Sequence, residues 1–167
     1  IVGGGVMGCA VAYFVAADPA FQGRILLLER DPSYAFASTT LSWGGYRQQF
    51  STPENIRMAT YSIPFLKSAY QTLAVDGEGP ALSLREQGYL FLASEQGEDA
   101  LRTSHAAQLA EGATVVMLDP DELARRFPWL NVDGIAAGSF GPSNEGWLDP
   151  HALLHGFRRQ ARDLGVT

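Results

Sequence analysis

The sequence predicts an α/β fold in which a doubly wound parallel sheet is interrupted by a second, more antiparallel layer. At the start of the chain, a glycine-rich turn joins the apolar stub Ile1-Val2 to a helical segment, and the apolar run Arg24 to Glu29 follows. The interruption is predicted by a change of texture near residues 88–93, which are aromatic-rich and strand-like. The predicted division is 1–82 for the first domain, 83–147 for the second, and 148–167 for a return to the first.

The first 29 residues read as a strand, a turn, a helix and a second strand. Apolar and small residues over 6–17 predict a buried helix, which Asp18-Pro19 ends. Between Arg24 and Glu29, residues 25–28 are continuously apolar. Such a run is typical of a central parallel strand that is buried on both faces.

Later segments alternate between helix and strand signals. The polar segment 31–49 is interpreted as a functional loop or a short helix start. A helix is predicted from Pro53 to about Ala74, with Thr52 as its N-cap. The remaining predicted elements are a break at 76–80, strands at 88–93, 115–118 and 135–140, helices at 95–110, from Asp119 and from Asp149-Pro150 to about Leu164, and the start of a strand at 165–167.

Composition excludes several classes of protein. Hydrophobic residues make up 46% of the chain and charged residues 18%, which indicates a packed core rather than disorder. The formal net charge of −6 disfavours nucleic acid and anionic membrane as partners. No apolar run approaches the roughly 20 residues of a membrane-spanning helix, so no membrane span is expected.

The single cysteine, Cys9, cannot form an internal disulfide, which indicates a reducing compartment. Its place in the alanine-rich helix favours a small packing residue over a reactive thiol. We therefore expect a cytoplasmic protein, with the mitochondrial matrix as the alternative in a eukaryote. Both ends look cut and the chain does not begin with Met, so we expect an N-terminal part of a longer protein.

Gly3, Gly5 and Gly8 match the pattern G-x-G-x-x-G. In this pattern the first glycine allows a tight turn, the second lets the backbone approach a pyrophosphate, and the third lets the helix pack closely on the strand. Val6 and Met7 lie in the first helical turn, whose free N–H groups and dipole attract phosphates. The motif therefore predicts a site for a dinucleotide that contains ADP.

Glu29 ends the second apolar run, where a carboxylate can accept hydrogen bonds from ribose hydroxyls. A carboxylate there also disfavours a 2′-phosphorylated cofactor, although the adjacent Arg30 complicates that argument. The motif does not separate FAD from NAD, because both contain ADP. The structural alternative is a glycine-rich turn without a ligand, with Glu29 as a solvated strand end.

The segment Ala37-Ser38-Thr39-Thr40-Leu41-Ser42-Trp43-Gly44-Gly45-Tyr46-Arg47-Gln48-Gln49-Phe50, followed by Pro53-Glu54-Asn55, resembles the D-amino-acid-oxidase-like family of FAD enzymes. It is most similar to the branch of sarcosine oxidase, dimethylglycine dehydrogenase and FAD-dependent oxidoreductase domain-containing proteins. Gln87 to Phe91 and Glu145 to Pro150 extend the resemblance over essentially the whole chain. The resemblance implies a Rossmann-type FAD-binding domain interrupted by part of an antiparallel-sheet substrate domain.

The resemblance also implies a larger cofactor site. It places Ser38, Thr39 and Thr40 near the pyrophosphate and ribityl chain, and it makes Arg47 a cation beside the flavin ring. Leu41 stands where one branch carries a flavin-linked histidine, so covalent attachment at this position is not expected, and any attachment would fall in a C-terminal half outside this chain. The other implied cofactor residues are Ser42 and Trp43 in the flavin loop, and Gly44 and Gly45 against the ring.

The implied activity is oxidation of a C–N bond in an amino acid or N-methylated amine, such as sarcosine, glycine or dimethylglycine, with hydride transfer to FAD. The electron acceptor stays open. A nicotinamide-dependent dehydrogenase and a non-catalytic FAD-binding assembly factor are the two alternatives. His151 and His155 are spaced as metal ligands on one helix, but with no third ligand in view we expect no metal site.

Overall fold

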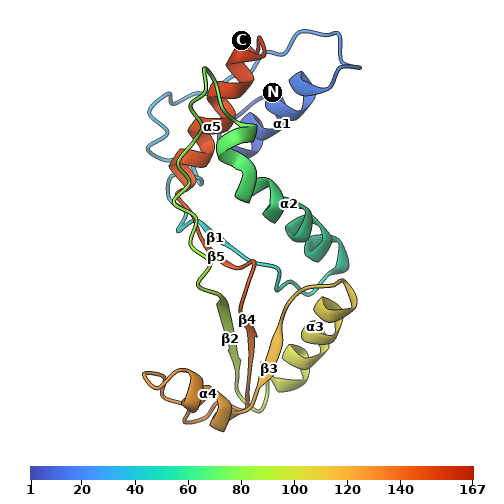
Figure 1. The fold of residues 1–167 in the computed structure, drawn as a ribbon, viewed down its shortest axis with the longest axis vertical. Helices are drawn as coiled ribbons and strands as arrows, with labels where there is room; N and C mark the ends of the chain where they lie inside the picture. Colours follow the sequence, from blue (N-terminus) through green and yellow to red (C-terminus); the bar gives the residue numbers. More distant parts are fainter. The chain divides into compact units, whose positions relative to one another are not determined.

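The computed structural model describes residues 1–167, which fold into two compact units (Figure 1). The first unit contains residues 1–44, 65–84 and 148–167, and the second contains 45–64 and 85–147. Residues 45–64 thus lie in the second unit, whereas the sequence-based division placed them in the first. That the first unit binds the cofactor and the second the substrate stays a prediction.

The first unit begins with a strand–turn–helix arrangement. Val2 forms a parallel bridge with Leu28, and helix α1 spans Val6–Ala17, as predicted. On the other side of residues 25–28, Leu27 N donates to Thr167 O at 2.8 Å and Thr167 N donates to Ile25 O at 3.1 Å. This alternation is the pattern of parallel pairing. Thr167 therefore extends beside residues 25–28 on the side opposite Val2, as predicted. Gly165, with a φ of 90°, still belongs to the turn after α5, so the predicted extended start is observed at Thr167 alone.

The prediction that residues 24–29 are buried on both faces is wrong for this chain. Leu26 and Leu28 are each 54% exposed. Alternate side chains of an extended segment point to opposite faces, so Leu27 points the other way, where it lines a small cavity together with Ala161. Helix α5, Pro150–Asp163, therefore covers only one face of this segment.

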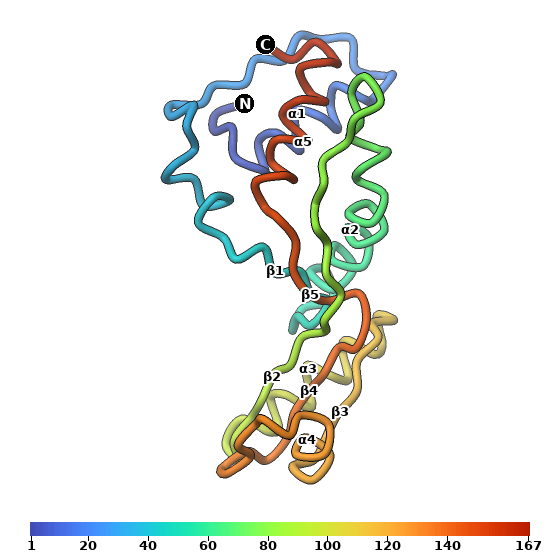
Figure 2. The backbone as a smooth tube through the Cα atoms, turned by 60° about the vertical axis from the view of Figure 1, so that its left-hand side comes forward, coloured from blue at the N-terminus to red at the C-terminus, as the bar shows by residue number.

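Helix α5 packs along α1, and the two lie side by side in both views (Figures 1 and 2). Aromatic side chains fill the contact: Phe65 stacks on Phe157 with ring centroids 5.4 Å apart, and Tyr13 and Phe14 complete the cluster. As predicted, α5 begins after an Asp149 cap, whose carboxylate accepts from the first backbone N–H groups of the helix.

Helix α2 spans Pro53–Thr72 and begins at the predicted proline. Its first part, through Pro64, belongs to the second unit and the remainder to the first. The predicted break follows, where Asp76 and Gly77 adopt positive φ angles of 54° and 83°. None of the helices of the described chain is long and apolar enough to cross a membrane.

The second unit contains an antiparallel sheet with the strand order β2-β4-β3, which agrees with the predicted second layer. Ser139 in the central strand lies opposite Phe91 on one side and Met117 on the other. Leu118, Leu123 and Phe140 form a core against this sheet. The elements are β2 Tyr89–Ala93, α3 Glu98–Ala110, β3 Val116–Leu118, α4 Pro120–Arg126 and β4 Ala137–Gly141, with β1 Gly45–Tyr46 pairing antiparallel to β5 Gly146–Trp147.

Candidate cofactor-binding site

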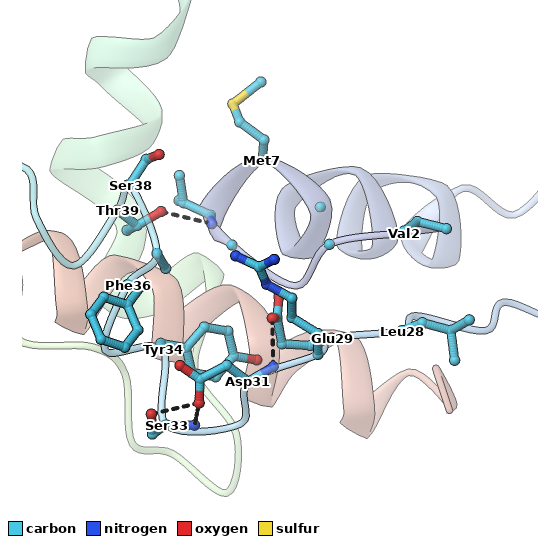
Figure 3. A pocket seen from close by; sticks show the side chains of 16 residues that line it. Val2, Met7, Leu28, Glu29, Asp31, Ser33, Tyr34, Phe36, Ser38 and Thr39 are labelled. Carbon is cyan, nitrogen blue, oxygen red and sulfur yellow. Dashed lines mark hydrogen bonds between the residues drawn. The ribbon is translucent and has the colours of Figure 1, made fainter.

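A cavity of about 1070 Å³ opens in the first unit between the start of α1 and the segment after residue 28 (Figure 3). Both the glycine-rich turn and Glu29 contribute to its wall, so the structure brings together two features that lie apart in the sequence. The residues lining it are Val2, Gly3, Gly5, Val6, Met7, Gly8, Leu28, Glu29, Arg30, Asp31, Ser33, Tyr34, Phe36, Ala37, Ser38 and Thr39.

Two glycines of the turn are required by the protein's own geometry. Gly3 has a φ of +97°, a conformation that side chains disfavour, and its N–H donates to Leu28 O. A Cβ at Gly8 would lie 1.9 Å from the carbonyl oxygen of Gly3. The absence of a side chain at Gly8 thus permits the close approach of α1 to the preceding extended segment.

Gly5 is different, because nothing in the protein requires a glycine there. Its φ of −62° and ψ of −179° suit any residue, and a Cβ at this position would meet only Thr39 Oγ1 at an ordinary 3.5 Å. Gly5 itself lines the cavity. This geometry fits a ligand that approaches the backbone at Gly5, which is the role of the second glycine in a pyrophosphate site.

Thr39 joins the loop after Glu29 to the start of α1. Its hydroxyl oxygen accepts from Val6 N at 3.0 Å, a bond drawn in Figure 3. The hydroxyl keeps its own proton to donate, and the first-turn N–H groups of a helix have no intrahelical acceptors. A phosphate at this helix end would find donors from both the backbone and the loop.

Glu29 is held by two backbone donors. Gly4 N donates to Oε2 at 2.6 Å and Asp31 N donates to Oε1 at 2.9 Å. These bonds, the one from Asp31 foremost, lower the pKa of Glu29 below its usual range. The carboxylate is therefore ionised at the cavity wall, and each oxygen retains a lone pair for a ribose hydroxyl.

The sequence predicted a functional loop over 31–49 but named no site residue in its first turn, residues 31–36, which also lines the cavity. Asp31 Oδ1 accepts from both the N–H and the hydroxyl of Ser33, and Tyr34 follows with a positive φ of 57°. Tyr34 is buried, and the Arg158 guanidinium lies 5.4 Å from its ring centroid. The Asp-Pro-Ser composition is a turn signal that could have located this part of the wall.

The predicted cofactor residues divide between the cavity and other places. Thr40 has a buried hydroxyl without a hydrogen-bond partner, and Trp43 is 95% exposed. A Cβ at Gly44 would lie 2.0 Å from Leu148 O, so glycine is required there by packing. The predicted residues that line the cavity are Gly3, Gly5, Val6, Met7, Gly8, Glu29, Arg30, Ser38 and Thr39, and those of the same unit that do not are Thr40, Ser42, Trp43 and Gly44.

Gly45 and Arg47 belong to the second unit. A Cβ at Gly45 would make only ordinary contacts, the nearest at 3.7 Å from Tyr89. The Arg47 guanidinium lies over three aromatic rings, with distances to the ring centroids of 4.7 Å for Phe50, 5.4 Å for Tyr89 and 5.5 Å for Phe91. These contacts hold the cation in one place while Nε alone is used in a bond to Gln49 O.

Comparison with known proteins identifies the group to which this arrangement belongs. A family model described as FAD dependent oxidoreductase matches residues 1–167. The chain belongs to this family of FAD-dependent oxidoreductases. FAD is the cofactor of the family, and the open backbone at Gly5, the start of α1 and the Glu29 carboxylate fit its ADP half.

Curated relatives in this FAD-dependent family are much longer than the chain. It is 46% identical over 169 residues to FAD-dependent oxidoreductase domain-containing protein 1 of Xenopus laevis, covering 99% of this chain and 34% of that protein. It is 27% identical over 167 residues to the mitochondrial dimethylglycine dehydrogenase of Rattus norvegicus, covering 99% of this chain and 18% of that protein. The chain thus spans about a third or less of the relatives it matches.

Solved structures confirm the predicted fold class. L-proline dehydrogenase from P. horikoshii superposes with a TM-score of 0.80 at 24% identity, over 99% of this chain and 41% of that one. Glycine oxidase from Geobacillus kaustophilus superposes with a TM-score of 0.78 at 21% identity, over 99% of this chain and 44% of that one. At these identities the likeness establishes the fold alone.

Proposed function

We propose that the cavity of the first unit binds the ADP half of FAD in the full-length protein. The pyrophosphate lies against Gly5 and the first turn of α1, Thr39 donates its hydroxyl proton to a phosphate oxygen, and Glu29 accepts from the ribose. The observation that carries this proposal is the open backbone at Gly5, where neither conformation nor packing requires a glycine. A ligand bound close to the backbone would explain why residue 5 is a glycine.

Replacing Gly5 with alanine tests this role directly. The methyl group would occupy the space proposed for the pyrophosphate, so we expect the FAD dissociation constant of the full-length protein to rise about 10-fold or more. At saturating FAD the melting temperature should return close to that of the wild type, because the methyl group meets no protein atom at a repulsive distance. A Gly5→Ala protein that binds FAD normally would contradict the proposed seat of the pyrophosphate.

We further propose that the full-length protein oxidises a C–N bond of an amino acid or an N-methylated amine. Support comes from the names of relatives and structural neighbours, which include dimethylglycine dehydrogenase, glycine oxidase and L-proline dehydrogenase. When bound, the flavin accepts the hydride, and the protein supplies orientation and charge. In this proposal Arg47 provides a fixed cation that favours negative charge on the flavin ring or on a substrate carboxylate.

Anaerobic titration of the purified full-length flavoprotein tests the activity. Glycine, sarcosine, dimethylglycine and L-proline are added separately, and the flavin band at about 450 nm is followed. We expect at least one of these compounds to bleach the band, and dithionite serves as the positive control for reduction. Retention of the band with every amine, together with bleaching by dithionite, would favour a non-catalytic FAD-binding protein.

A further inference from the structure

Glu145 is a charged residue that the proposed chemistry does not use, yet the second unit buries it completely. It directly precedes β5, and its carboxylate lies among backbone and side-chain donors. Oε1 accepts from Gln48 N at 2.7 Å and from Gln49 N at 3.0 Å, while Oε2 accepts from Gln49 Nε2 at 2.8 Å. One carboxylate therefore binds three donors of the two residues that follow Arg47.

The Gln49 amide extends this network into the sheet. Its Oε1 accepts from the buried Ser139 hydroxyl at 2.6 Å, and its Nε2 also donates to Tyr89 O at 2.9 Å. Ser139 lies in β4 and Tyr89 in β2. The carboxylate, the amide and the hydroxyl thus anchor residues 48–49 to two strands of the antiparallel sheet.

The Arg47 side chain depends on the same anchored segment. Its Nε donates to the carbonyl oxygen of Gln49, and two of the three rings beneath its guanidinium belong to Tyr89 and Phe50. Gln49 N and Gln49 O therefore connect Glu145 to the guanidinium through a single residue. A shift of this residue would move the hydrogen-bond acceptor of Arg47 and the following Phe50 ring together.

The protein retains this carboxylate despite a cost. Burial raises the pKa of Glu145, and the hydrogen bonds from Gln49 and Gln48 and the positive charge of Arg47 oppose that rise. A buried carboxylate is costly unless its hydrogen bonds are made, as they are here. The neighbouring Gly141 provides the space for this carboxylate, because a Cβ at residue 141 would lie 2.0 Å from Oε2 of Glu145. Space, donors and a countercharge all converge on Glu145.

We propose that Glu145 is a positioning residue, which fixes the segment Arg47–Gln49 so that the Arg47 guanidinium is held where it acts on the flavin. This inference rests on the role proposed above for Arg47. The oxygens of Glu145 are occupied by donors of the anchored segment, an arrangement that suits a positioning role rather than that of an acid or base.

Sulfite affinity of the full-length flavoprotein provides a readout besides activity. Sulfite bleaches the flavin band at about 450 nm by forming an anionic species, which a nearby cation stabilises. The variants are Arg47→Met, Glu145→Gln, their double mutant and the milder Ser139→Ala, and Glu86→Gln is the control. Glu86 is exposed, and its Oε1 accepts a hydrogen bond from the backbone N–H of Asn144, the residue before Glu145. FAD content and melting temperature are measured for each variant.

The sign of the change separates positioning from simple electrostatics. Removing a negative charge near Arg47 would by itself strengthen sulfite binding, whereas a misplaced guanidinium weakens it. We expect the sulfite dissociation constant to rise about 10-fold in Arg47→Met, about 3- to 10-fold in Glu145→Gln, less in Ser139→Ala, and not at all in Glu86→Gln. In the Arg47→Met background, Glu145→Gln should add less than a factor of about 2.

Each failure has its own pattern. If Arg47→Met weakened sulfite binding while Glu145→Gln left it unchanged or strengthened it, the positioning role of Glu145 would be overturned. The proposed role of Arg47 would then still stand. An unchanged Arg47→Met would overturn the proposed role of Arg47 and this inference with it. Additive effects in the double mutant would show that Glu145 acts independently of Arg47, which also overturns the inference.

Discussion

Replacing Gly8 with alanine is expected to lower the free energy of unfolding of the full-length protein by about 3 kcal/mol, near the upper end for overpacking. The added methyl group would lie 1.9 Å from the backbone oxygen of Gly3, and backbone cannot move aside as a flexible side chain can. Alanine favours a helix over glycine by about 1 kcal/mol, which offsets only part of this cost. The melting temperature should fall by about 3 °C, because the unfolding entropy grows with chain length and this chain covers only 34% of a relative's length.

The two glycine variants form a matched pair, because each adds one methyl group to the same turn. For Gly8→Ala, excess FAD should leave a deficit in melting temperature relative to wild type, since the clash lies within the protein. For Gly5→Ala, excess FAD should remove most of the deficit, because the defect is in binding. If both variants recovered equally with FAD, the distinction between a packing glycine and a ligand-facing glycine would be wrong.

Local signals predicted the helices of this fold well. Helix α5 begins at the predicted Asp149-Pro150 step, and α4 begins after Asp119, which forms a capping box with Glu122. Helix α1 ends at Ala17, immediately before the predicted Asp18-Pro19 stop. Caps act through residues within one turn, so a single sequence contains the necessary information.

Features that depend on distant residues were not predictable from the sequence. The exposure of Leu28 depends on what covers the extended segment, whereas its apolar character predicted burial. The bond from Val6 N to Thr39 joins residues 33 apart, and the bond from Gln48 N to Glu145 joins residues 97 apart. In the sequence, Glu145 belonged to a segment that extended the family resemblance, and no role was predicted for it. The residues adjacent to it in the sequence give no sign that it is buried.

The candidate site was predictable in part. The G-x-G-x-x-G pattern predicted a separate role for each glycine, and the tight turn at Gly3 and the close packing at Gly8 are observed, whereas the approach of a pyrophosphate to Gly5 stays a prediction. The structure assigns conformation to Gly3, packing to Gly8 and an open face to Gly5. It also gives Gly44 a packing reason, a Cβ clash with Leu148 O, that the resemblance had attributed to the flavin. Mutating a glycine tests cofactor binding only where packing does not already require it.

The second large effect is expected where Gly141 faces Glu145. Gly141→Ala places a methyl group 2.0 Å from Oε2 and 2.4 Å from the carboxyl carbon, so the carboxylate must leave its donors. Glu145→Ala removes the carboxylate and leaves Gln48 N and Gln49 N without their acceptor in a buried place. We expect each single change to lower the free energy of unfolding by about 2–4 kcal/mol.

The double mutant should be no less stable than Glu145→Ala alone, within about 0.5 kcal/mol, because the methyl group then enters space that the carboxylate has vacated. The coupling energy would accordingly be about 2 kcal/mol or more and favourable. Chemical denaturation of the four full-length proteins at saturating FAD measures it. Additive losses of stability would mean that the methyl group at residue 141 disturbs β4 itself. In that case the glycine at this position would not serve to make space for the Glu145 carboxylate.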